Sequence, residues 1–184
     1  DAAVCTVHGD VWRVSGIDDD LDEINWKRYA TGLHQPLGLK MVDNKAHVLE
    51  RDQITILHDL NGDNEADFYE NFNNDVVSGG GGHAFATSLE TDPEGNFWFM
   101  KCGEDTPQGG TIMRVSKDGS KLEVIATGFR NPNGMGVSPD GVVTAGDQQG
   151  TWVPETRLDV IKKGGFYGYM PMHKRDIAPT DFDP

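Results

Sequence analysis

An internal repeat constrains the fold of this chain more than any other feature of its sequence. The segments ATGLHQPLGLKMVDN (Ala30 to Asn44) and ATGFRNPNGMGVSPDG (Ala126 to Gly141) share A-T-G and P-x-G phrases at an offset of 96 residues. A third copy lies between them, because SLETDPEGNFWFMKCGED matches GMGVSPDGVVTAGDQQG, with Gly95 and Gly141 offset by 46 residues. The opening AAVCTVHGDVWRVSGIDDD likewise matches KAHVLERDQITILHDLNGD. A chain with this pattern is expected to fold as a series of similar units.

Each unit reads as an antiparallel meander of short strands. Apolar and polar residues alternate along each run, and turns of the D-N, P-E-G or P-D-G kind join the runs. The units recur every 46 to 51 residues, with four expected strands each and almost no amphipathic helix, which is typical of propeller blades. We therefore predict an all-β fold, a β-propeller, with an open β-sandwich as the alternative. Three runs illustrate the strands: Asn96 to Lys101, Thr111 to Ser116 and Arg157 to Lys162.

The length of the chain bears on how the propeller closes. The 184 residues hold just under four units, and a propeller must close to hide the edges of its sheets. Because closure with four blades is uncommon, we expect residues 1–184 to be a single incomplete propeller segment that starts and ends mid-blade. It would belong to a ring of about six blades, with the remaining blades supplied by the parent chain or by another chain. The chain opens without an initiating Met or a leader, which indicates a processed or excised chain.

The segment DLNGDNEADFYE, residues 59 to 70, spaces its oxygen-bearing residues like a calcium-binding loop. Calcium takes about six to eight oxygen ligands, and a loop of about twelve residues supplies them from positions 1, 3, 5, 7, 9 and 12, position 7 through its backbone carbonyl. Those positions are filled here by Asp59, Asn61, Asp63, Glu65, Asp67 and Glu70. Asn64 stands where glycine is expected at the sharp turn, and asparagine tolerates a positive φ well. The strand-like QITILH before the loop predicts a structural calcium on a blade connection, with a solvated acidic turn as the alternative.

Composition excludes several classes of partner and favours one location. Thirty acidic residues against sixteen basic ones give a formal charge of −14, which repels nucleic acid and anionic membrane faces. No run approaches eighteen apolar residues, so we expect no membrane span. Cys5 and Cys102 lie far apart and outside any CxxC or CxxCH spacing, which leaves a disulfide and two buried thiols as alternatives. Acidity, sparse cysteines and the calcium-like loop together favour a periplasmic or secreted protein.

A glycine run precedes a histidine that could act as a base. In GGGGHAF, residues 79 to 85, His83 follows four glycines and stands just before an expected strand. Glycines allow the backbone to approach a ligand closely, and a neutral imidazole can accept a proton at about pH 7. A purely structural histidine is the alternative.

The segment from Gly128 to Met170 contains the phrases RNPNG, DQQG and KKGGFYG in this order. They resemble the hallmark segment of the soluble quinoprotein glucose/sorbosone dehydrogenase family, and the resemblance extends back to about Ala30. These sequence motifs resemble even more closely the propeller portion of planctomycete-type extracytoplasmic proteins known as membrane-bound dehydrogenases, which often carry haem c modules. The resemblance implies a six-bladed propeller that holds pyrroloquinoline quinone (PQQ) and calcium at the top of its central channel and oxidises sugars.

The resemblance also implies roles for individual residues. His83 is similar to the base that removes the proton of the anomeric hydroxyl as hydride passes to the quinone. Arg130 would face the quinone oxygen and stabilise the charge that develops there. The other implied positions bind the cofactor through side chains or, for the last two, bind its calcium through carbonyls: Asn131, Gln149, Gly150 and Thr151.

The sequence departs from the family pattern at two of these places. Phe85 follows the histidine closely, where the family has glycine, and Thr151 stands where proline is common. The RNP phrase could be only a blade turn, since HQP (residues 34–36) occupies the equivalent place in the earlier repeat. We predict a quinoprotein-like oxidoreductase acting on a sugar or polyol, with a cytochrome c-like electron acceptor. The alternative is a non-catalytic, calcium-stabilised propeller that binds a polysaccharide or a protein, or a scaffold in a redox assembly.

Overall fold

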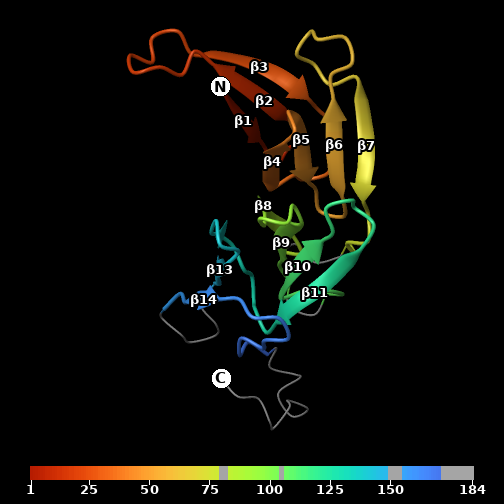
Figure 1. Ribbon diagram of the computed structural model, residues 1–184, viewed down its shortest axis with the longest axis vertical. Helices are drawn as coiled ribbons and strands as arrows, with labels where there is room; N and C mark the ends of the chain where they lie inside the picture. The colour runs from red at the N-terminus through yellow and green to blue at the C-terminus, as the bar shows by residue number, and fades with distance from the viewer. Residues whose placement is uncertain (79–82, 104–105, 149–154, 171–184) are drawn as a thin grey trace.

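The structure is a computed structural model that describes residues 1–78, 83–103, 106–148 and 155–170. Within these residues, the regular structure consists of fourteen β-strands (Figure 1). Among the described residues, no helix is long and apolar enough to cross a membrane. The fold is therefore all-β, as the sequence predicts.

The strands form four antiparallel sheets, and within each sheet the spatial order of the strands follows the chain. The first sheet contains β1 (Ala2–Cys5), β2 (Val11–Ser15) and β3 (Asn25–Ala30). The second contains β4 (Gly38–Val42), β5 (Lys45–Leu49), β6 (Ile54–His58) and β7 (Phe68–Asn73). The third contains β8 (Ala86–Thr91), β9 (Phe97–Lys101), β10 (Thr111–Val115) and β11 (Leu122–Thr127). The fourth contains β12 (Met135–Val137), β13 (Val143–Gly146) and β14 (Leu158–Val160).

Turn chemistry explains where the strands reverse. Asp43 and Asn44 join β4 to β5 with φ of 49° and 61°, the left-handed pair that a two-residue hairpin requires and that Asp and Asn accept best. Gly95 and Gly141 adopt φ of 87° and 84° at the equivalent turns of the third and fourth sheets. The D-N, P-E-G and P-D-G turns predicted from the repeat are therefore the hairpin turns of the structure.

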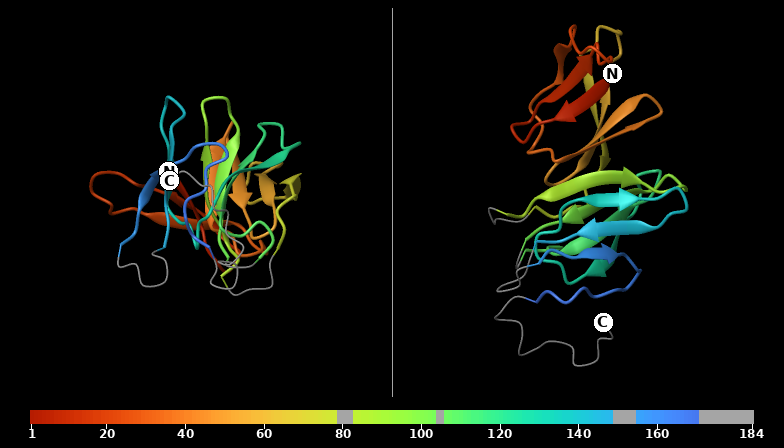
Figure 2. Two further views of the ribbon diagram at one scale, coloured as in Figure 1. Left: turned by 90° about the horizontal axis from the view of Figure 1, so that it is seen from below. Right: turned by 90° about the vertical axis from the view of Figure 1, so that its left-hand side faces the viewer.

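The sheets follow one another along an arc. The first strands β1, β4, β8 and β12 contact each other in series, and Figures 1 and 2 show the sheets fanned out with β7 and β11 on the convex side. Shared apolar cores join neighbouring sheets. One core joins the second and third sheets through Leu49, Ile54, Phe97, Phe99 and Met113, and others lie on either side of it. Because the third sheet is covered on both faces, every residue of β9 is buried.

The segment after β14 ties the fourth sheet to the third. Thr127 at the end of β11 forms a parallel bridge with Phe166, and the N–H of Tyr169 donates to the carbonyl of Gly128 at 2.7 Å. The Tyr167 ring stacks on Phe129 with 4.8 Å between centroids. The KKGGFYG phrase thus packs adjacent sheets together. Cys5 and Cys102 are free thiols on different sheets, so the disulfide alternative does not hold.

Candidate functional site

A pocket of about 540 Å³ opens where the loops of the second, third and fourth sheets meet. It is formed by the loops that precede β4, β8, β12 and β14, by the start of β8 and by the residues that follow β9 and β13. The lining residues are Leu37, His83, Phe85, Thr87, Cys102, Asn131, Asn133, Asp147, Gln148 and Thr156. The structure therefore brings the predicted His83 and Asn131 to one pocket, with Arg130 adjacent in the chain.

The loop that carries His83 is held in place on both sides. The side chain of His83 is exposed, whereas Ala84 is buried and its carbonyl accepts a hydrogen bond from Lys101 Nζ at 3.0 Å. The guanidinium of Arg51 lies over the Phe85 ring at 5.2 Å, and this contact fixes the aromatic side chain at the pocket wall. Phe85 and His83 therefore line the same pocket.

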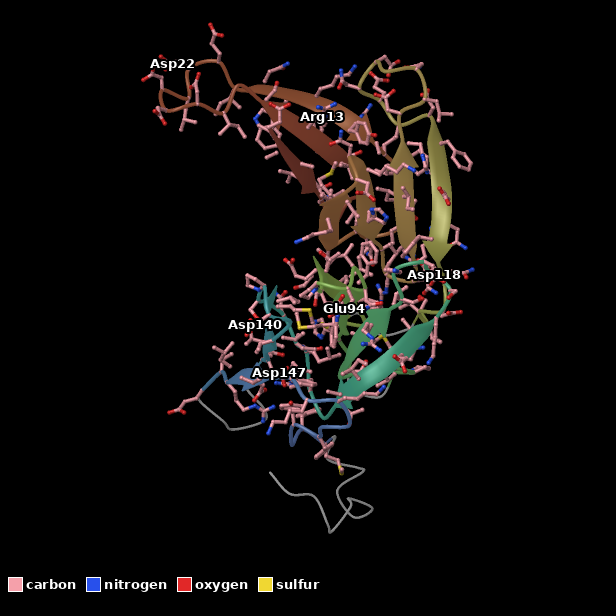
Figure 3. All side chains as sticks on the ribbon, viewed as in Figure 1. Arg13, Asp22, Glu94, Asp118, Asp140 and Asp147 are labelled. Carbon is pink, nitrogen blue, oxygen red and sulfur yellow. The ribbon has the colours of Figure 1, made fainter. Side chains whose placement is uncertain are left out.

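Asp147 is the buried carboxylate of the pocket (Figure 3), and it was missed by the sequence analysis. It accepts the backbone N–H of Arg130 at 2.9 Å and that of Asn131 at 3.0 Å. Burial raises the pKa of Asp147, and these backbone donors oppose the rise. The carboxylate therefore fixes the backbone turn of the RNP phrase.

Asn131 is also bonded through its side chain. Its Oδ1 accepts the N–H of Gly103 at 3.2 Å, and its Nδ2 donates to Gln148 Oε1 at 3.0 Å. The predicted cofactor and calcium positions Gln149, Gly150 and Thr151 lie outside the described residues. Their proposed roles stay predictions.

A thiol and a hydroxyl support the same turn from the third sheet. The Pro132 carbonyl accepts Thr87 Oγ1 at 2.9 Å and Cys102 Sγ at 3.3 Å. Burial raises the pKa of Cys102 to about 11, so the thiol stays protonated and has little nucleophilic character. Its contribution to the pocket is packing and one weak hydrogen bond.

The acidic loop between β6 and β7 closes through its own backbone. Asp59 accepts the N–H of Gly62 at 2.7 Å and that of Asn64 at 2.9 Å, and Asn64 has a φ of 65°, as its position predicts. Although partial desolvation pushes the pKa of Asp59 up, its backbone donors outweigh this effect and lower it. Asp67 Oδ2 accepts the Leu60 N–H at 2.8 Å.

The structure does not assemble all six predicted calcium positions. Glu70 lies on β7, and its Oε2 is 2.6 Å from His58 Nε2. Glu65 is predicted to bind through its backbone carbonyl, so the ion pair of its side-chain Oε1 with Lys27 Nζ at 3.3 Å does not test that position. Within the described ranges, no group of three or more His, Cys, Asp or Glu side chains is arranged to hold a metal ion. Calcium at this loop stays a prediction.

The acidic loop and the pocket are distant from each other. Arg13 Nη1 donates to Asn64 Oδ1 of the loop, and Figure 3 shows Arg13 at the opposite end of the molecule from Asp147. An ion in the loop would therefore stabilise the first two sheets and would take no part in pocket chemistry.

No protein-family model matches the chain, and no curated protein matches it by sequence. Solved structures do match. An oxidoreductase described as a glucose dehydrogenase from Thermus thermophilus superposes with a TM-score of 0.67 at 14% identity, over 91% of this chain and 60% of that one. The described sheets are blades of a β-propeller.

Two further propellers match over a similar part of the chain. The soluble aldose sugar dehydrogenase of Escherichia coli superposes with a TM-score of 0.62 at 12% identity, over 91% of this chain and 58% of that one. The PQQ domain of pyranose dehydrogenase from Coprinopsis cinerea, in its holo form, superposes with a TM-score of 0.59 at 11% identity, over 87% of this chain and 47% of that one. The chain therefore spans 60% of the length of the Thermus structure, 58% of the Escherichia coli structure and 47% of the Coprinopsis domain. We number the sheets blades 1 to 4 in chain order.

Proposed function

We propose that this chain is the pocket-bearing part of a propeller oxidoreductase that oxidises a sugar or polyol with PQQ. The observation that carries the proposal is that His83 and Asn131 line one pocket formed by three consecutive blades, and that Asp147 of this pocket binds the backbone N–H of Arg130. The propellers that match this chain include sugar dehydrogenases and a holo PQQ domain. Function lies in the site and not in the fold, so the pocket must supply the argument.

The chain's own residues suit part of this chemistry. When bound, PQQ would supply the redox capacity that amino acid side chains lack. The exposed imidazole of His83 can accept a proton from a substrate hydroxyl. Arg130 would contribute positive charge beside the reacting oxygen, and Asn131 with Gln148 would contribute amide hydrogen bonds.

The described lining residues do not supply the positive charge that the carboxylates of PQQ require. PQQ carries carboxylates, whereas the described residues that line the pocket include the carboxylate of Asp147 and no lysine or arginine. Cations that neutralise the cofactor would therefore come from outside this lining. We propose that the remaining blades of a closed ring, of about six in total, supply them.

The rest of the proposal concerns the surroundings of the protein. We propose a periplasmic or secreted location and a cytochrome c-like electron acceptor. Calcium would serve the acidic loop as a structural ion and the pocket as a cofactor ion.

One observation favours a second candidate. Phe85 occupies the pocket wall next to His83, and Asp147 makes the described lining acidic. The acidic lining suits an uncharged glycan chain better than an anionic quinone, and an aromatic ring can pack on a sugar face. The second candidate is a non-catalytic propeller that binds a polysaccharide or a protein partner, or that acts as a scaffold in a redox assembly.

Reconstitution separates the two candidates. The purified protein is incubated with PQQ and calcium, and bound quinone is measured by absorbance and dye reduction with aldoses. The proposal predicts a bound chromophore and turnover, with turnover lost in His83→Ala and Arg130→Ala and kept in the exposed controls His8→Ala and Arg28→Ala. Glycan-array binding without redox turnover would support the second candidate.

A further inference from the structure

One register position carries a buried charged side chain in three consecutive blades. In blade 2, Gly38 of the P-x-G phrase pairs with Leu49, and Glu50 is the next residue. In blade 4, the carbonyl of Gly134 of the P-x-G phrase accepts the N–H of Gly146, and Asp147 is the next residue. Lys101 holds the corresponding place in blade 3, 46 residues before Asp147. The exposed fractions of Glu50, Lys101 and Asp147 are 3%, 0% and 6%.

The two carboxylates bind the loop that leads into their own blade. Glu50 Oε2 accepts the backbone N–H of His34. Asp147 accepts the N–H of Arg130 with both oxygens, at 2.9 and 3.2 Å, and the N–H of Asn131 at 3.0 Å. His34 and Arg130 hold the same place in the repeat, just before the proline of the P-x-G phrase. Blades 2 and 4 therefore bind the backbone of the same loop through a carboxylate, although the two side chains differ in length.

Blade 3 uses the opposite charge because its loop presents the opposite backbone group. Lys101 Nζ donates to the carbonyl of Ala84 at 3.0 Å and to that of Arg51 at 3.1 Å. Ala84 follows His83 directly, and Arg51 belongs to blade 2. The ammonium group therefore joins the His83 loop to the neighbouring blade.

Burial of a charge is costly, and an apolar side chain would fill the same space at lower cost. The residues just before Glu50 and Lys101 are Leu49 and Met100, both fully buried. The feature that the three charged residues share is a hydrogen bond to the loop before the innermost strand. The core alone gives no reason for a charge at this position in each of the three blades.

We propose that Glu50, Lys101 and Asp147 are positioning residues. Each fixes the loop before the innermost strand of its blade, on the side of the blades where the pocket lies, and each of these loops carries one residue of interest. Those residues are His34, His83 and Arg130. The consequence for turnover rests on the function proposed above, whereas the consequence for loop geometry does not.

The test uses amide hydrogen exchange, followed by NMR on the protein without ligand. In Asp147→Asn, the exchange rates of the Arg130 and Asn131 amides should rise by about tenfold or more, because the amide side chain cannot replace a carboxylate that accepts on both oxygens. Amides of β9 and β10 should keep their rates. Asp147→Glu is the matched variant, since Glu50 does the same work in blade 2, and it should keep most of the protection.

Lys101→Met tests the blade of opposite charge. Methionine fills a similar volume but cannot donate to the Ala84 carbonyl, so the imidazole resonances of His83 should shift and broaden. The control Lys121→Met removes a lysine whose side chain is 67% exposed, and it should leave those resonances unchanged.

Unchanged exchange at Arg130 and Asn131 in Asp147→Asn would overturn the inference. Uniformly faster exchange throughout blade 4 would overturn it as well, because Asp147 would then act as a general core residue. If wild-type protein binds no quinone while the local exchange changes as expected, the proposed function fails and the positioning inference stands. If quinone turnover is present, Asp147→Asn should lower kcat with little change in KM.

Discussion

The carboxylate of Asp147 accepts the backbone N–H of Arg130 at 2.9 Å, and this contact links the end of β13 to the loop before β12 within blade 4. The two residues belong to the RNPNG and DQQG phrases, which are 13 residues apart in the sequence. The structure shows that these two phrases touch.

The titration of Asp147 should make stability depend on pH. Burial raises its pKa above the ordinary value of 3.8, so the folded state binds this proton more tightly than the unfolded state does. The stabilising effect is full below pH 3.8 and is lost as the pH rises through the higher pKa of the folded state. The free energy of unfolding of wild-type protein should therefore fall across this window relative to that of Asp147→Asn. Urea unfolding at a series of pH values measures this difference, and parallel pH profiles would contradict it.

Two glycines with the same backbone angle should differ in their tolerance of alanine. Gly128 and Gly134 have φ of 84° and 83°. A Cβ on Gly128 would lie 2.7 Å from the backbone N of Tyr167, whereas one on Gly134 would meet no atom within 4 Å.

Gly134→Ala should therefore cost only the backbone strain of about 1 kcal/mol. Gly128→Ala should cost about 2 kcal/mol or more, because it also displaces the Phe166–Tyr167 segment. Urea unfolding compares the two variants. Equal losses would show that the segment after β14 does not pack on blade 3 as described.

The acidic loop should respond to calcium. An ion that binds only the folded protein stabilises it by about 2.7 kcal/mol at about 100 times its dissociation constant, so calcium should raise the Tm by about 5 °C or more and a chelator should reverse the rise. Asp63→Asn should weaken this response. Asp118→Asn is the matched control, because Asp118 also lies in an exposed turn and accepts hydrogen bonds from Ser116 and Ser120. A melting temperature that does not change with calcium would indicate that the loop is a solvated acidic turn and binds no ion.

The thiol of Cys102 should be inert in the folded protein. It is buried, and its pKa is raised to about 11, so almost no thiolate exists at neutral pH. A thiol-specific reagent should label Cys102 only after unfolding. Labelling of the native protein at Cys102, measured by peptide mass spectrometry, would show that the pocket wall opens.

The strands were predictable because local residues specify them. The D-N and P-x-G turns fix the hairpins, and the predicted run Asn96 to Lys101 is β9 with one residue fewer. The repeat then predicted the propeller, since equal units must pack in the same way.

The pocket was only partly predictable, because it depends on contacts between distant residues. His83 and Arg130 were predicted from phrases of the sequence. Lys101 carried no local signal except its charge at the end of an apolar run, and the DQQG phrase did not indicate what Asp147 binds. Their partners lie 16 to 50 residues away along the chain. Glu70 illustrates a limit of spacing rules: its place on β7 directs it to His58, so loop position alone did not determine its contacts.

The most direct test of the account is a titration with PQQ and calcium of the complete protein, with the remaining blades of the ring present, followed by quinone absorbance. The account predicts saturable binding with one quinone per chain, weakened in Arg130→Ala and unchanged in the exposed control Arg28→Ala. Absence of saturable binding by the intact, folded protein, or equal binding by both variants, would contradict it.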